Sequence, residues 1–71
     1  MNVEKIGTNA GLVWNALNEA DVLGTKQLKK ITKLKDKELY AAIGWLARED
    51  KINISESEDA KELLVSLVQD R

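Results

Sequence analysis

Hydrophobic residues with helical spacing form the clearest pattern in the second half of the chain. Leu39, Ile43 and Leu46 stand at i, i+4 and i+7, which predicts one buried stripe of an amphipathic helix. Asp36 and Glu38 suit the first turn of this helix, because carboxylates there complement the helix dipole. We therefore expect a helix that starts near residue 36.

The chain beyond this helix, which should end near Glu49, has a pattern that favours strands. An Asp50-Lys51 turn leads to residues 52–54, where β-branched and polar residues alternate. Residues 62–68 fit either a second strand or a helix, because periodicity alone does not separate the two. The β-branched valines in that stretch favour a strand and therefore a C-terminal hairpin.

The first twenty residues predict a helix from about Val3 to Ala20, with Asn2 as its N-cap. Its expected core stripe, in which Trp14 is a core residue, consists of Val3, Ile6, Ala10, Val13, Trp14 and Leu17.

Two glycines one turn apart, Gly7 and Gly11, interrupt this helix pattern and would let another backbone come close. One interpretation is tight packing inside the monomer. The other is a contact between two chains through Gly11, Leu12 and Ala16, since Leu12 and Ala16 fall opposite the expected core stripe.

The segment between the two long helices predicts a short helix and a tight turn at residues 32–35. Thr25 is the expected N-cap, and Leu28 and Ile31 should face inward. Leu34 should fill the space between the two helices. Together these elements predict a mainly α fold with a small β-hairpin, a winged helix-turn-helix of three helices plus a C-terminal wing.

Composition limits the chemistry that the chain could perform. Seventy-one residues predict a single domain over 1–71, to which the connector at 21–24 could add one strand that pairs with the wing. The sequence contains no Cys, no His and no Gly-rich phosphate loop, so we expect that the protein is not an enzyme and has no cofactor and no metal site.

No apolar run is long enough for a membrane span and no leader pattern is present, so we expect a cytoplasmic protein. The small size makes dimerisation possible, because a partner chain could cover part of the core, and we expect a homodimer if the protein binds DNA.

Two stretches, Asn9–Trp14 and Leu39–Ile52, resemble a family of small bacterial winged helix-turn-helix proteins classed as a domain of unknown function. The resemblance extends from about Ile6 to Ile54, and Tyr40–Lys51 is its most specific part. It implies the winged-helix fold with a C-terminal hairpin, and it implies no particular activity.

Positive charge gathers in one part of a chain whose net charge is only −1. Residues 25–37 hold a single acid, Asp36, and six lysines: Lys26, Lys29, Lys30, Lys33, Lys35 and Lys37. Phosphate contacts in a helix-turn-helix come from this region, so these lysines, with Arg48, are candidate contacts to double-stranded DNA. Acidic residues expected around the wing would repel a DNA duplex and so argue against DNA binding; they are Glu49, Asp50, Glu56, Glu58 and Asp59.

The outward face of the 36–49 helix should present Lys37, Ala41, Gly44, Trp45 and Arg48. Trp45 could instead lie over the base of the wing, and we expect it to be largely buried there. An exposed Trp beside small residues would favour a protein interface over a DNA contact.

Two functions follow as hypotheses. The first is a homodimeric winged-helix protein that binds DNA and regulates transcription. The second is a protein-interaction module on the same scaffold, with contacts through Leu12 and Ala16 or through Trp45 and Ala41.

Overall fold

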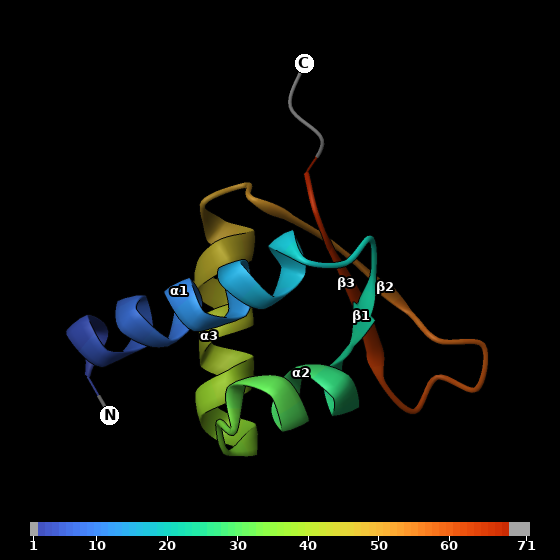
Figure 1. Ribbon diagram of the computed structural model, residues 1–71, viewed down its shortest axis with the longest axis horizontal. Helices are drawn as coiled ribbons and strands as arrows, with labels where there is room; N and C mark the ends of the chain where they lie inside the picture. The colour runs from blue at the N-terminus through green and yellow to red at the C-terminus, as the bar shows by residue number, and fades with distance from the viewer. Residues whose placement is uncertain (1, 69–71) are drawn as a thin grey trace.

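The computed structural model describes residues 2–68, and within them it contains three helices and three strands. In chain order these are α1 (Val3–Asn18), β1 (Leu23–Gly24), α2 (Thr25–Thr32), α3 (Asp36–Arg48), β2 (Ile52–Glu56) and β3 (Leu63–Leu67). The strands pair antiparallel in the order β1-β3-β2, and β2 and β3 are the two arms of the wing (Figure 1). This is a winged helix-turn-helix, as the sequence predicts. Both the connector strand and the strand form of residues 63–67 are confirmed.

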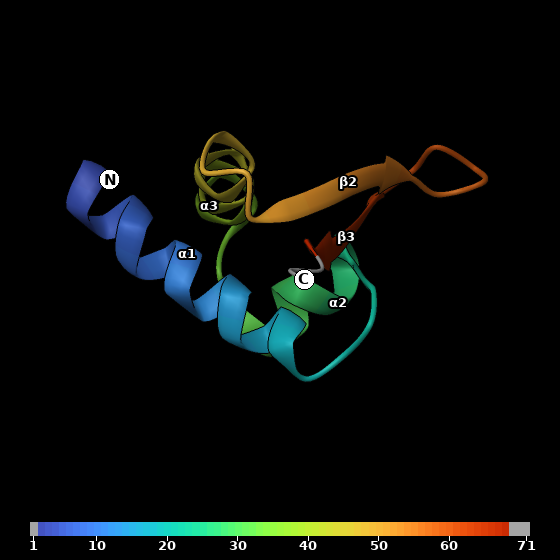
Figure 2. The same ribbon diagram turned by 90° about the horizontal axis from the view of Figure 1, so that it is seen from above.

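One hydrophobic core joins all three helices to the sheet. The largest fully buried side chains are Val13, Leu17, Leu28, Leu39 and Val65. α1 packs mainly against α3. Figure 2 shows α3 and β2 on one side of the molecule, with α2 and the C-terminal end of α1 on the other. Burying a Leu or Val side chain stabilises the fold by about 1.5–3 kcal/mol, so these five residues carry much of the stability.

α1 is shorter and is rotated relative to the expectation. The Asn2 side chain accepts a hydrogen bond from the backbone N–H of Lys5 at 2.8 Å, which confirms the N-cap, but the helix ends at Asn18 rather than Ala20. Val3 is 66% exposed and Trp14 is 37% exposed, so their expected core positions are wrong.

The buried face of α1 instead consists of Asn9, Ala10, Val13, Ala16 and Leu17. Small residues such as Ala10 and Ala16 let a crossing helix come close, whereas an indole at the crossing would hold the helices apart. Ala16 is therefore inside the monomer and is not a surface residue for a contact between chains. The buried Asn9 amide nitrogen has no hydrogen-bond partner.

α2 begins one residue earlier than expected and buries fewer hydrophobic side chains. Gly24 is its N-cap, and Thr25 is already its first helical residue. Leu28 is fully buried, but Ile31 is 56% exposed and does not face inward. A two-turn helix presents only one narrow face to the core, and Thr25, Leu28 and Thr32 already occupy that face.

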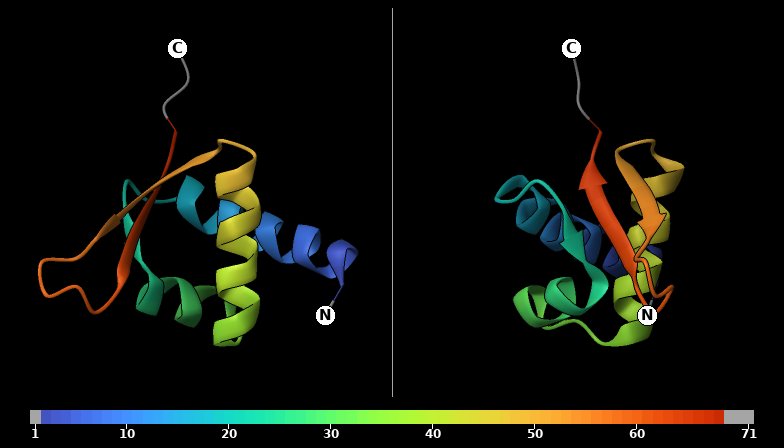
Figure 3. Two further views of the ribbon diagram at one scale, coloured as in Figure 1. Left: turned by 180° about the vertical axis from the view of Figure 1, so that it is seen from behind. Right: turned by 90° about the vertical axis from the view of Figure 1, so that its right-hand side faces the viewer.

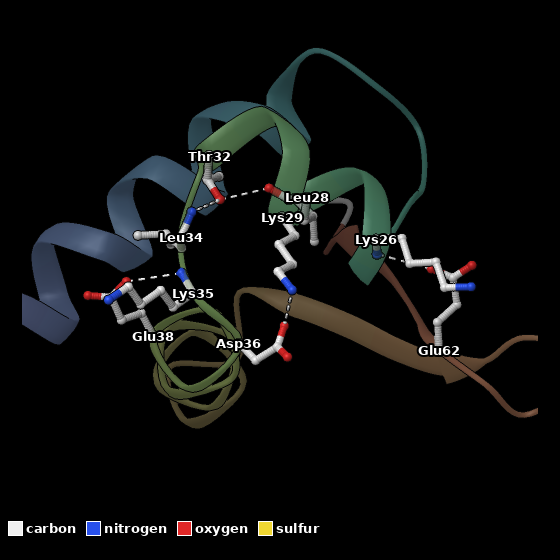
Figure 4. A network of polar contacts seen from close by, with 9 residues as sticks. All are labelled: Lys26, Leu28, Lys29, Thr32, Leu34, Lys35, Asp36, Glu38 and Glu62. Carbon is white, nitrogen blue, oxygen red and sulfur yellow. Dashed lines mark hydrogen bonds and ion pairs between the residues drawn. The ribbon is translucent and has the colours of Figure 1, made fainter.

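The turn between α2 and α3 is held by Thr32 and Leu34. The Thr32 hydroxyl donates to the Leu28 carbonyl oxygen at 2.7 Å and accepts from the Leu34 backbone N–H at 3.3 Å (Figure 4). Lys33 between them adopts the left-handed conformation, with a φ of 61°. Leu34 is buried between the helices, as expected. α3 therefore has a fixed orientation relative to α2.

Candidate nucleic-acid interface

The outer face of α3 carries two cations separated by small residues. Lys37, Ala41, Gly44 and Arg48 lie one turn apart along the side of the helix opposite the buried stripe of Leu39, Ala42, Ile43 and Leu46. Lys37, Gly44 and Arg48 are exposed and Ala41 is half-buried. A Cβ atom at Gly44 would meet no neighbouring element within 4 Å. Another surface can therefore approach the middle of α3 closely.

α3 lies at the surface of the molecule with the wing beside it, as the left view of Figure 3 shows. Between α2, α3 and the wing is a hollow of about 230 Å³. Lys26, Lys29 and Lys61 line it together with Asp36 and Glu62, and Tyr40 stands in it, 46% exposed. The charge balance around the hollow is therefore only slightly positive.

Glu62 from the wing lies against the N-terminus of α2. Its carboxylate accepts a hydrogen bond from the backbone N–H of Lys26 at 3.1 Å (Figure 4). Gly24 makes this possible, because a Cβ at that position would lie 2.9 Å from the carboxyl carbon of Glu62. A helix N-terminus attracts anions, so Glu62 occupies a position that a phosphate would favour.

A second acid reduces the charge of the lysine-rich stretch. Lys29 pairs with Asp36 at 2.8 Å, and both side chains are more than half exposed. Such a surface pair stabilises the fold by less than about 1 kcal/mol. The pair still places a negative charge next to Lys29, which weakens its attraction for a phosphate.

The six lysines do not form one patch. Lys26 and Lys29 border the hollow, and Lys37 lies on the outer face of α3. Lys33 and Lys35 stand in the turn as the C-cap of α2 and the N-cap of α3, while Lys30 is exposed on α2.

The wing tip is held together by one of its acids. The Asp59 carboxylate accepts hydrogen bonds from the Ser57 hydroxyl at 2.6 Å and from the Lys61 backbone N–H at 3.1 Å. These hydrogen bonds lower the pKa of Asp59 from its usual value of 3.8, and the bond from Ser57 has the largest effect. Asp59 is therefore a structural residue of the loop as well as a surface charge.

Two of the acids that were expected around the wing lie at its base and not in the hairpin. Glu49 is the C-cap of α3, and Asp50 follows it in the turn to β2 with a φ of 59°. The acids of the wing hairpin are Glu56, Glu58, Asp59 and Glu62.

Trp45 does not cover the base of the wing. It is 38% exposed and lines a second hollow, between α1 and α3, with Trp14. Of the other expected interface residues, Gly11 and Leu12 are exposed and Ala41 is half-buried. Sequence reasoning placed the α3 face correctly but missed Tyr40, Lys61 and Glu62, whose roles depend on how the wing sits against α2.

Comparison with known proteins agrees with this architecture. Residues 1–67 match the family described as winged helix-turn-helix domain DUF2582. The chain belongs to this family. It is also 46% identical over 54 residues to the uncharacterised protein MJ1608 of Methanocaldococcus jannaschii, in a match covering 68% of this chain and 71% of that protein.

A solved relative has the same fold as this DUF2582 domain. The solution NMR structure of protein BT2368 from Bacteroides thetaiotaomicron superimposes with a TM-score of 0.81 at 36% identity, covering 94% of this chain and 79% of that one. Within residues 2–68, no helix is both long and apolar enough to cross a membrane, and no three metal-ligating side chains gather in one place.

Proposed function

We propose that this DUF2582 domain binds double-stranded DNA, with the outer face of α3 in the major groove, and that it acts by binding rather than by catalysis. The observation that carries the proposal is the arrangement of Lys37, Ala41, Gly44 and Arg48 on one exposed face of the second helix of a helix-turn-helix. A helix in that position enters the major groove in proteins of this fold. Small residues at its centre would let the backbone approach the base edges.

Phosphate contacts would come from the end of this face where α3 begins. Lys26 at the start of α2 and Lys61 in the wing flank α3, and Lys35 precedes it. The acids Asp36 and Glu62 lie among these lysines, so we expect weaker binding than that of a strongly basic winged helix. Four phosphate contacts, from these three lysines and Lys37, would make the affinity fall about 100-fold between 50 and 200 mM salt.

Base readout would be limited. Arg48 can bind guanine through two hydrogen bonds, and Ala41 can contact a thymine methyl group. The outer face offers no Asn or Gln for adenine. We therefore expect binding to many sequences with a modest preference for G- and T-containing sites.

Fluorescence anisotropy with a labelled random-sequence duplex at about 50 mM salt tests the proposal. The double variant Lys37→Glu, Arg48→Glu should lose more than about tenfold in affinity, since it reverses the charge at both ends of the face. The matched control Lys5→Glu reverses an exposed charge on α1 and should stay within about twofold of the wild type. No binding by the wild type at tens of micromolar, or an equal loss in the control, would overturn the proposal.

A further inference from the structure

An exposed apolar face runs along α1 on the side away from α2. The hollow between α1 and α3, about 260 Å³, is lined by Gly7, Gly11, Trp14, Trp45 and Lys51 among others. A Cβ atom at either glycine would meet no neighbouring element within 4 Å. The two indoles are each more than a third exposed and line the same hollow, so they form part of a contiguous apolar patch and are not scattered surface residues.

The exposed apolar face of α1 extends to the N-terminal end of this helix. Val3, Gly7, Gly11 and Trp14 stand at i, i+4, i+8 and i+11, which places them on one stripe. The first turns of α1 extend beyond α3, with nothing packed over them, in both Figure 1 and Figure 2. The stripe is therefore open to another molecule along its whole length.

We propose that this face binds a second copy of the chain, with the two α1 helices packed antiparallel about a two-fold axis between Gly7 and Gly11. A two-fold contact requires a surface that is complementary to itself. Here Gly7 of one copy would face Gly11 of the other, so the backbones can come close. Val3 would then cover the exposed indole of Trp14 in the other copy.

The charges along the stripe are complementary in the same register. Glu4 stands beside Val3 at the open end, and Lys51 lines the hollow at the Trp14 end. The antiparallel arrangement brings Glu4 of one copy to Lys51 of the other, twice by symmetry. A parallel arrangement would bring like charges together, which disfavours it. This complementarity points to a second copy rather than to an unrelated partner.

The surface differs from the contact between chains that the sequence offered as one of two interpretations. Gly11 belongs to both, but Leu12 points away from the hollow and Ala16 is buried. Two four-turn helices make a small contact, so we expect association at micromolar concentrations. The inference goes beyond DNA binding and does not depend on it, because it concerns the protein alone.

Sedimentation equilibrium without DNA, from about 5 to 500 μM protein, tests this dimer. The wild type should shift from monomer to dimer over that range. Gly11→Leu should weaken association more than about tenfold, because the added side chain blocks the approach of the second helix. Gly11→Leu should keep its fold, since Leu favours a helix over Gly and the site is open in the monomer.

Gly44→Leu is the matched control, since Gly44 is also an open helical glycine but lies on the outer face of α3. It should dimerise like the wild type. A wild type that stays monomeric at 500 μM, or equal weakening by both glycine variants, would overturn the proposal.

A charge swap tests the register. Glu4→Lys and Lys51→Glu alone should each weaken the dimer about tenfold, because each replaces two attractions with two repulsions. The double variant should recover to within about twofold of the wild type. Failure of the double variant to recover would overturn the antiparallel register.

Discussion

The carboxylate of Glu62 accepts a hydrogen bond from the backbone N–H of Lys26, at 3.1 Å, across 36 residues of sequence. The wing thereby supplies the N-terminal cap that Gly24, which has no side chain, cannot supply to α2. Gln27 adds a local bond, since its side chain accepts from the Gly24 N–H at 3.2 Å. The position of the wing and the start of the helix-turn-helix are therefore coupled.

Gly24→Ala and Glu62→Ala should have non-additive effects on stability. Each alone should lower the free energy of unfolding by about 1 kcal/mol, because the new methyl group displaces the Glu62 carboxylate and the truncation removes it. In the Glu62→Ala background, Gly24→Ala should cost almost nothing. Urea denaturation of the four proteins measures the cycle. Additive effects would show that the two residues are not coupled.

Neutralising the same carboxylate should strengthen the proposed binding to DNA. Glu62→Gln removes a negative charge from the N-terminus of α2 and keeps an oxygen that can accept from Lys26. We expect about a threefold gain in affinity at 50 mM salt, measured by anisotropy. Glu19→Gln, an exposed change at the end of α1, is the control and should give no gain. An unchanged affinity in Glu62→Gln would place the α2 N-terminus outside the interface.

The hydrophobic pattern of the sequence correctly predicted α3 and the wing hairpin, because each of these depends mainly on residues close together in the chain. The Leu39, Ile43 and Leu46 stripe gave α3, because a helix in contact with both α1 and the sheet must bury one continuous side. The same stripe then identified the outer face with Lys37 and Arg48, since those positions follow from rotation about the helix axis. The hairpin followed from its β-branched residues.

The features that the sequence did not predict depend on contacts between segments that lie far apart in the chain. Hydrophobicity ranked Trp14 above Asn9 as a core residue of α1, but the close crossing of α3 buries the smaller side chains. Ile31 was expected inside for its hydrophobicity, although α2 is too short to bury a second stripe. The contact of Glu62 with α2 joins distant segments, and no periodicity in the sequence encodes it.

The wing tip should loosen in acid because of Asp59. Its pKa is lowered in the folded loop by the hydrogen bonds from Ser57 and Lys61, so its stabilising contribution is present above about pH 4 and is lost as the pH falls through the lowered value. The Lys61 amide should be protected from hydrogen exchange at pH 5 and should lose protection below pH 4. Asp59→Asn keeps an oxygen acceptor without the titration, so its Lys61 protection should show no such step. A step of equal size in Asp59→Asn would assign the transition to another group.

Lys33 should be a site where one substitution stabilises the domain. It ends α2 in the left-handed conformation, with a φ of 61°, which costs a residue with a Cβ about 1 kcal/mol relative to glycine. Lys33→Gly should therefore raise the free energy of unfolding by about 1 kcal/mol and the Tm by about 4–8 °C. Lys33→Ala removes the same charge but keeps the Cβ, so it should give no comparable gain. Thermal denaturation of the two variants separates the backbone effect from the charge effect. Equal gains in Tm for both variants would show that the stabilisation comes from reduced repulsion among the lysines.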